Sequence, residues 1–223
     1  MSDAQNGQKI IHIDVVSDVM CPWCFIGKRR LEKALAIVDP SIKVEVDWKP
    51  FQLDATLPPE GKDRQLYLSE KFGGKTSADA KYAQIRSAGA DENIPFDFDA
   101  IKVSPNTLNA HRVIAWAGEA GHHRQDRVVD RLFEAYFTEG KNIGDKAVLA
   151  SLAGDAGMDP SAVATRLETE EGLDEARQAV DHAHQIGVTG VPCFIIEQKY
   201  GVSGAQDPNT LANAIAQIAA EQS

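Results

Sequence analysis

The chain has 223 residues, a formal net charge of −10 at pH 7, 43% hydrophobic residues and three cysteines. A chain of this length buries roughly 70–75% of the surface of its unfolded form, so it can build a large core without disulfide bonds. Three cysteines are too few for a disulfide-stabilised secreted scaffold, and the acidic balance argues against general binding of nucleic acid.

The first part of the chain predicts a β-α-β unit. Residues 1–8 are polar, lack the apolar stretch of a secretory signal and are predicted to be disordered, so we expect a cytoplasmic protein. No stretch approaches the ~20 apolar residues that a membrane-spanning helix needs. Residues 10–16 are rich in β-branched side chains and predict a buried strand. A helix follows to about Val38, because Pro22 suits a first helical turn, and the alternation of residues 44–48 predicts a second strand.

From about residue 57 to residue 187 the pattern predicts helices separated by Gly, Pro and Asn. These helices are expected at 62–73, 76–89, 107–120, 124–139, 145–156, 160–169 and 172–186. Strand character returns at residues 191–197 and 200–203, and an Ala- and Ile-rich helix covers about 208–221. The order predicts an α/β fold with a central mixed sheet, because the first crossover is parallel and the last two strands form a hairpin.

The motif with the clearest chemical content is Cys21-Pro22-Trp23-Cys24, between a buried strand and the start of a helix. At a helix start the first thiol faces outward beside unsatisfied backbone N–H groups and the positive end of the helix dipole, which favour a thiolate. Two intervening residues bring the second thiol within one turn, so that it can resolve a mixed disulfide. We therefore predict Cys21 as the attacking nucleophile, Cys24 as the more buried resolving thiol, and Trp23 as an exposed substrate contact.

The cysteine pair has two alternative interpretations. A zinc site would need two further ligands, and the chain has no second Cys-x-x-Cys motif, so no metal is expected. Two unrelated buried thiols would not need a strand-to-helix junction. The basic residues Lys28, Arg29 and Arg30, one to two turns further along, are interpreted mainly as a solvated helix face.

The segment Thr189-Gly190-Val191-Pro192 begins the late strand. A proline in a central strand removes a ladder hydrogen bond and is tolerated where the backbone turns sharply, often with a cis bond. A cis Val191–Pro192 bond would present the Val191 N–H and C=O to an extended peptide or to glutathione. The alternative is a trans proline at a strand start. Cys193 is expected to be a small buried hydrophobe, with a third redox thiol as the alternative.

The histidines give no metal motif. His12, in the first strand, and His111, on a helix with an apolar side, are both expected in the core. His182 and His184 lie two residues apart on a predicted helix, so they point in different directions and form a poor metal pair.

Several segments from about residue 10 to the C-terminus occur together: Ser17-Asp18 with the cysteine motif, Trp48-Lys49-Pro50-Phe51, Asn106-Thr107 with Ala110-His111-Arg112, Ala135-Tyr136-Phe137 with Gly140 and Asn142-Ile143, Gly187-Val188-Thr189-Gly190-Val191-Pro192, and Ser203-Gly204-Ala205-Gln206. With these segments the sequence resembles the DsbA family of thioredoxin-fold proteins, and within it the FrnE-like branch. The resemblance implies a thioredoxin-like domain of residues 9–56 and 188–223, interrupted by an α-helical domain of residues 57–187 that roofs the site.

The activity that the resemblance implies is thiol–disulfide exchange with a protein substrate, without a prosthetic group and with the direction open. Substrate contacts are implied for Pro22, Trp23, Val191 and Pro192. Glutathione is an implied redox partner or co-substrate, because related proteins hold its γ-glutamyl end about where Gln206 stands. Asp207 is better interpreted as the cap of the last helix.

The same family contains glutathione-dependent 2-hydroxychromene-2-carboxylate isomerases and kappa-class glutathione transferases. These proteins typically have serine where Cys21 stands, so the presence of both cysteines favours redox exchange. Such an isomerase or transferase is the first alternative function, and a non-catalytic chaperone or binding module is the second. The residue after Pro192 is commonly aromatic in the FrnE-like branch, and Cys193 departs from that pattern. The sequence does not indicate an oligomeric state.

Overall fold

A central sheet with the strand order β2-β1-β5-β6 organises the molecule. The computed structural model describes residues Lys9–Glu221, except the side chain of Lys75, so the disorder predicted for residues 1–8 lies outside it. β1 (Lys9–Ser17) and β2 (Ile42–Pro50) are parallel, whereas β5 (Cys193–Ile196) is antiparallel to both β1 and β6 (Tyr200–Ser203). The predicted α/β fold with a mixed sheet is therefore confirmed.

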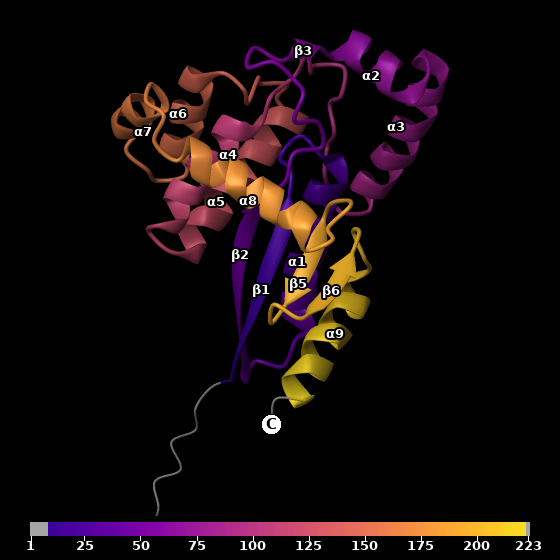
Figure 1. The fold of residues 1–223 in the computed structure, drawn as a ribbon. Coiled ribbons are helices and arrows are strands. Elements are labelled where there is room, and N and C mark those ends of the chain that lie inside the picture. Colours follow the sequence, from indigo (N-terminus) through magenta and orange to yellow (C-terminus); the bar gives the residue numbers. More distant parts are fainter. Residues whose placement is uncertain (1–8, 222–223) are drawn as a thin grey trace, which may run out of the picture.

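Two helices cover one face of this sheet. α1 (Pro22–Ile37) and α9 (Pro208–Glu221) pack against each other and run alongside the strands (Figure 1). The side chains of Ile11, Ile13 and Val15 point to this face and are 0–1% exposed, because successive residues of a strand alternate between its two sides. Burial of these β-branched side chains fixes which face of β1 meets the helices.

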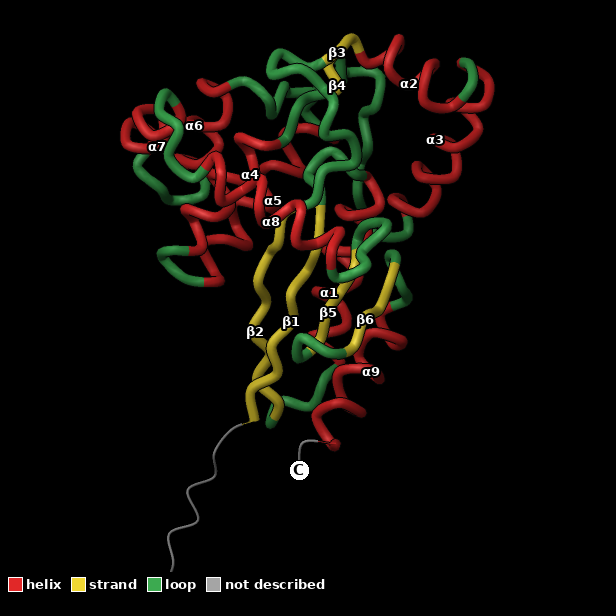
Figure 2. The backbone as a smooth tube through the Cα atoms, viewed as in Figure 1, coloured by secondary structure: helices red, strands yellow, loops and turns green. Residues whose placement is uncertain are grey.

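A helical insertion separates β2 from β5. It contains α2 (Arg64–Phe72), α3 (Lys75–Ala90), α4 (Leu108–Gly118), α5 (His122–Phe137), α6 (Lys146–Asp155), α7 (Pro160–Leu167) and α8 (Leu173–Gln185). These helices lie over the end of the sheet where β1 and β2 finish, and loops gather there (Figures 1 and 2). Every predicted helix is present, with ends shifted by at most a few residues.

One small feature of the insertion was not predicted. β3 (Lys62–Asp63) and β4 (Val103–Ser104) form a two-stranded sheet, and the first of them occupies the start of the helix expected at residue 62. The Asp63 side chain then accepts a hydrogen bond from the Leu66 N–H and caps α2. Strands of two residues are too short to show an alternating pattern.

The expectation that His12 lies in the core is wrong. Its side chain is 58% exposed and lies 3.5 Å from a Glu45 oxygen of the neighbouring strand. His12 alternates with Ile11 and Ile13, so it points to the opposite face of the sheet. That face is solvated here, where charged residues of β1 and β2 pair with each other, as Lys49 does with Asp14 at 3.2 Å.

The expectation of a solvated Lys28 is also wrong. Its side chain is 2% exposed, and its ammonium lies 3.0 Å from Asp126 and 3.7 Å from Asp130, both on α5. It also pairs with Glu32 one turn along α1. Burial alone lowers the pKa of Lys28, but Asp126, Glu32 and Asp130 outweigh burial and raise that pKa above its ordinary value.

The neighbouring arginines make similar connections. Arg29 is paired with Asp130 at 2.7 Å, and Arg30 is paired with Glu92 at 2.6 Å. Arg30 also donates to the carbonyl oxygen of Ala205, in the loop after β6. The basic segment of α1 is thus a set of attachments to the helical insertion and to the C-terminal part of the sheet.

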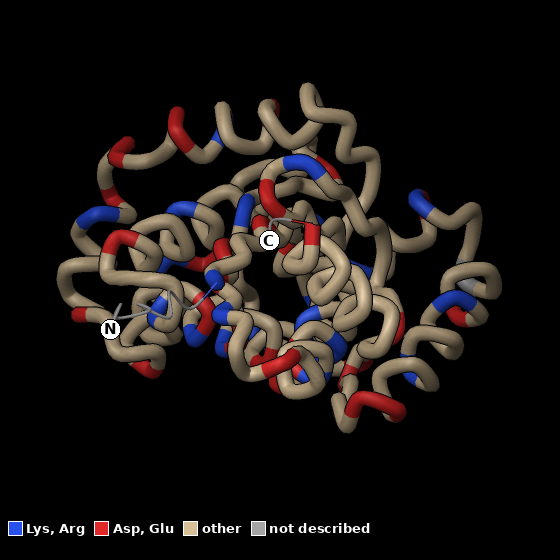
Figure 3. Tube along the Cα trace, turned by 90° about the horizontal axis from the view of Figure 1, so that it is seen from below, with Lys and Arg blue, Asp and Glu red and all other residues tan. Residues whose placement is uncertain are grey.

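Opposite charges are interspersed over the rest of the described chain (Figure 3).

Of the helices between Lys9 and Glu221, none is both long and apolar enough to cross a membrane. The same residues contain no group of three or more His, Cys, Asp and Glu side chains placed to hold a metal ion.

Lys28→Ala should lower the free energy of unfolding by about 2 kcal/mol, because it removes a buried side chain from the core and leaves the partly exposed Asp126 without its ion pair. Urea denaturation followed by circular dichroism measures this loss. Lys33→Ala is the matched control: Lys33 also pairs with a carboxylate, that of Glu92, but is 47% exposed, so its loss should cost less than about 1 kcal/mol. Equal effects of the two substitutions would contradict a structural role for the buried ammonium.

Candidate active site

The two cysteines of the motif lie where β1 passes into α1. After Ser17 the chain turns, and the Cys21 N–H donates to the Asp18 carbonyl oxygen at 2.9 Å. Cys21 is the N-cap residue of α1, Pro22 its first residue, and the Cys24 N–H donates to the Cys21 carbonyl at 3.0 Å. The predicted strand-to-helix junction is therefore confirmed, and it places both thiols in the first turn.

Both thiols are buried, which corrects the expectation that Cys21 faces outward. Cys21 is 4% exposed and Cys24 is fully buried. Tyr82 on α3 lies close enough to Cys21 for their charges to interact. Burial raises the pKa of the Tyr82 hydroxyl, and the proximity of Cys21 raises it further, although Arg64 opposes both effects. Helix position alone predicted an open thiol, because a sequence pattern does not show which segments will pack around the start of a helix.

The surroundings of Cys24 favour the neutral thiol. Burial raises its pKa well above the ordinary value, and the adjacent Cys21 raises it further. The Ser17 hydroxyl and the Asp18 backbone act in the opposite direction but do not overcome burial. Cys24 therefore needs help to lose its proton.

The predicted cis bond at Val191–Pro192 is present. The Cys21 thiol lies 3.8 Å from the Val191 carbonyl oxygen, so this segment forms a wall of the site. The Gly204 N–H donates to the Pro192 carbonyl oxygen at 2.8 Å, whereas no residue between Lys9 and Glu221 accepts a hydrogen bond from the Val191 N–H. β5 begins at Cys193 and not at Val191 as predicted, because Pro192 has no N–H to give to a ladder.

Close packing holds α1 against this segment. A Cβ atom added to Gly27 would lie 2.8 Å from the Pro192 ring and 3.5 Å from the Phe194 ring. Glycine is therefore needed in α1 for the cysteine motif to reach the cis proline. Sequence reasoning missed Gly27, because a glycine inside a helix pattern gives no sign of which residue it will contact.

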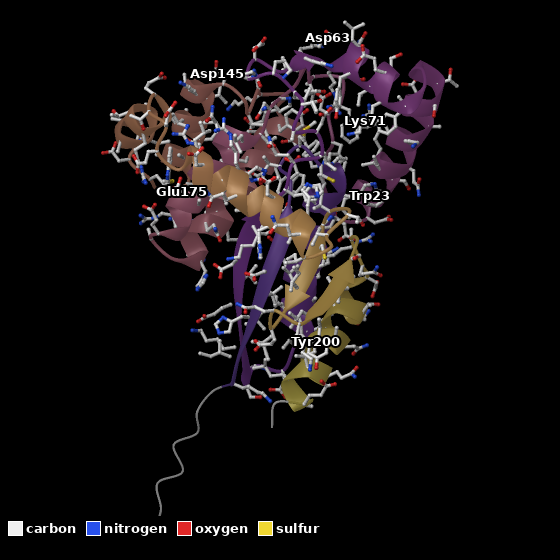
Figure 4. The ribbon with its side chains drawn as sticks, viewed as in Figure 1. Trp23, Asp63, Lys71, Asp145, Glu175 and Tyr200 are labelled. Carbon is white, nitrogen blue, oxygen red and sulfur yellow. The ribbon has the colours of Figure 1, made fainter. Side chains whose placement is uncertain are left out.

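The other predicted substrate contacts lie nearby. Trp23 is partly exposed on α1 (Figure 4), whereas Pro22 is buried. Gln206 is exposed, and its amide donates to the Ser203 carbonyl oxygen at 2.7 Å. Asp207 accepts from the Asn209 N–H at 2.8 Å, which confirms its interpretation as the cap of α9.

Residues 12–216 match the family described as the DSBA-like thioredoxin domain. The chain belongs to this family. It is 33% identical over 208 residues to the uncharacterized protein YwbO of Bacillus subtilis, covering 92% of this chain and 96% of the relative. It also resembles the structure of a probable DsbA oxidoreductase of Streptomyces coelicolor, with 29% identity, a TM-score of 0.84, and coverage of 96% of this chain and 91% of that one.

A more distant likeness concerns the fold alone. A 2-hydroxychromene-2-carboxylate isomerase shares 15% identity with this DsbA-like chain, with a TM-score of 0.70 and coverage of 95% of this chain and 97% of that one.

Cys193 does not belong to the site. It lies in a separate cluster with Val16, Phe51 and Val188, on the face of the sheet opposite to α1. It is 6% exposed, burial raises its pKa, and its sulfur lies 4.0 Å from the Ser203 hydroxyl. This position agrees with the small buried hydrophobe expected from the sequence.

A buried Asp18–His111 pair supports the cysteine loop. Asp18 is fully buried and accepts from the Leu53 N–H at 2.8 Å and the Met20 N–H at 3.3 Å. The Nε2 of His111 lies 2.8 Å from the Phe51 carbonyl oxygen and 3.6 Å from Asp18. His111 is thus in the core, as expected, but no sequence pattern indicated that it would lie beside Asp18.

Gly27→Ala should separate α1 from Pro192, because neither the helix backbone nor the proline ring can absorb a 2.8 Å contact. We expect a loss of about 1–3 kcal/mol in the free energy of unfolding, together with slower reaction of Cys21 with a disulfide. Denaturation and stopped-flow thiol exchange measure the two effects. Gly201→Ala is the control, since a Cβ there meets nothing within 4 Å; matching behaviour of the two variants would refute the close-packing argument.

Proposed function

We propose that this DsbA-like protein is a thiol–disulfide oxidoreductase, with Cys21 as the attacking nucleophile and Cys24 as the resolving thiol. The observation that supports this most directly is the 3.8 Å contact between the Cys21 thiol and the Val191 carbonyl oxygen. A Cys-x-x-Cys pair at a helix start, beside a cis X–Pro backbone, brings a reactive sulfur next to an edge where an extended chain can bind.

The exchange proceeds in two balanced steps. The Cys21 thiolate attacks a substrate disulfide, forming a mixed disulfide and releasing one substrate thiolate, which takes a proton from solvent. The Cys24 thiolate then attacks the Cys21 sulfur, forms the Cys21–Cys24 disulfide and releases the second substrate thiol. The substrate gains two electrons and the protein loses two, and the reverse sequence oxidises a dithiol. The relative stability of the two forms of the pair sets the direction.

Substrate docking is assigned to the backbone at Val191–Pro192. The N–H of Val191 is available to a substrate, and its C=O faces Cys21, so an extended peptide could pair with this residue while its sulfur reaches the thiol. Trp23 offers a partly exposed aromatic surface next to the cysteines, and the buried Pro22 fixes the first helical turn beneath it. Such docking needs no particular substrate side chain.

Other parts of the proposal rest on the sequence. Membership of the FrnE-like branch, a cytoplasmic location and the domain boundaries at residues 57 and 187 stay predictions. A protein substrate with a disulfide or a dithiol is the proposed partner. A glutathione-dependent isomerase is the rival function, since the isomerase named above shares the fold, but the presence of both Cys21 and Cys24 favours redox exchange.

Cys21→Ser should reduce disulfide exchange with insulin or a dithiol peptide by roughly 1,000-fold or more, because the nucleophile is lost. Cys24→Ser should instead accumulate a mixed disulfide on Cys21, visible by mass spectrometry. Cys193→Ser is the matched control and should keep its activity. Trp23 fluorescence, followed in glutathione buffers, gives the reduction potential of the pair and thus the direction.

Turnover of a chromene carboxylate with glutathione that survives both Cys21→Ser and Cys24→Ser would favour the isomerase. Absence of exchange at every redox poise would favour a chaperone or binding module.

Gln206→Ala should raise the KM for glutathione roughly 2–10-fold, the effect of losing one hydrogen bond to the ligand. This expectation follows from the exposed position of Gln206 in the loop that is bonded to Pro192 through Gly204. Steady-state reduction of the pair by glutathione measures it. Gln217→Ala, an exposed glutamine on α9, is the control, and equal KM values in both variants would exclude Gln206 as a contact.

A further inference from the structure

A small cavity lies at the end of β1, where the chain passes toward the cysteine motif. Its volume is about 10 Å³, near the smallest that holds one water molecule. It is lined by Ser17, Lys49 and His111 and by apolar residues of the loop after β1, of β2, of α4 and of α5. Ser17 is 4% exposed, and its hydroxyl has no hydrogen-bond partner among the described residues. A buried hydroxyl facing a cavity is normally satisfied by water, so this cavity is suited to hold one.

The same hydroxyl also influences Cys24. The Ser17 side chain lowers the pKa of Cys24, although burial outweighs this effect, and no hydrogen bond joins the two groups in this structure. The other groups that act on Cys24 are Cys21 and the Asp18 backbone. In the mixed disulfide the Cys21 sulfur is bonded to the substrate and cannot take a proton. Ser17 is then the neighbouring side chain through which the Cys24 proton can leave.

His111 can accept that proton. Because the Phe51 carbonyl oxygen only accepts hydrogen bonds, the Nε2 of His111 carries hydrogen and its Nδ1 is the basic nitrogen. Lys49 is a poor acceptor, because its ammonium is held by Asp14 at 3.2 Å. The Asp18 carboxylate, 3.6 Å from His111 Nε2, can pair with the protonated ring.

His111 also borders a second, larger groove. His111, Ile114, Trp48 and Lys49 also line a groove of about 530 Å³ between β2, α4 and α8. Glu175 at the rim of this groove and Trp23 on α1 are labelled at opposite sides of Figure 4. A proton on His111 can therefore reach solvent away from the surface to which a substrate binds.

We propose that Ser17, a water molecule in the cavity and His111 form a proton relay for Cys24. This inference rests on the function proposed above and adds the residues that serve its second step. As Cys24 attacks the Cys21 sulfur, its proton passes through the Ser17 hydroxyl and the water to His111, and then through the groove to solvent. The electron pair of the broken disulfide leaves with the substrate thiolate, which is protonated from bulk solvent. Ser17 and His111 change protonation only transiently.

The test separates the two thiol steps with 5,5′-dithiobis(2-nitrobenzoate). In a Cys193→Ala background, attack by Cys21 releases the first coloured thiolate and attack by Cys24 releases the second, and stopped-flow absorbance follows both. Ser17→Ala and His111→Gln should slow the second release roughly 10–100-fold and leave the first within about twofold. The glutamine amide can still donate to Phe51, so the fold around His111 is kept.

The pH profile distinguishes a relay from a structural role. In both variants the logarithm of the second rate should rise with pH with a slope near one between about pH 6 and pH 9, because hydroxide must replace the relay. Ser104→Ala is the control, since Ser104 is also a buried serine without a hydrogen-bond partner among the described residues but lies in β4. It should change neither release.

Equal slowing of both releases, or a second release slowed less than about threefold in both variants, would overturn the relay. Release of a single thiolate by the protein with Ser17 and His111 intact would contradict the resolving role of Cys24 itself. That result would remove the proposed function as well, and so differs from failure of the relay alone.

Discussion

The approach of α1 to the cis proline is the contact on which the site depends. At Gly27 the helix backbone has no side chain, and the Pro192 ring fills the space that a Cβ would need. This contact brings together two segments from opposite ends of the chain and places the Cys21 thiol beside the Val191 carbonyl oxygen. Arg30 makes a second connection, because it donates a hydrogen bond from α1 to the Ala205 carbonyl oxygen in the loop after β6.

Burial changes the chemistry of the pair by removing water from it. In an open junction, a cysteine at a helix start is surrounded by solvent and favourable backbone dipoles. Here Cys21 is 4% exposed and Cys24 is fully buried, so proton transfer depends on the side chains that surround them. Lys28, one turn beyond Cys24, ties the helix that carries both thiols to α5 of the insertion.

The sequence allowed the fold and the position of the cysteine pair at a strand-to-helix junction to be predicted, because both depend on short-range patterns. Alternation along β1, the proline after Cys21 and the late Val191–Pro192 each have a local meaning. Residues whose role depends on distant neighbours were misjudged or missed. Lys28 was expected on the surface because its partners Asp126 and Asp130 lie about a hundred residues further along. His12 was placed in the core because the pattern did not show that the face of the sheet opposite to α1 is solvated around this residue, and no sequence pattern singled out Ser17.

The position of Cys193 has a consequence for the redox cycle proposed above. Three free thiols could in principle pair in three ways, and two of those pairings would be unproductive in that cycle. Strand alternation places Cys193 on the face of the sheet opposite to α1, in a separate cluster, while both other thiols lie at the start of α1. The sheet thus separates Cys193 from the pair, which allows a chain with an odd number of cysteines to act, in the proposed cycle, as a single dithiol–disulfide couple.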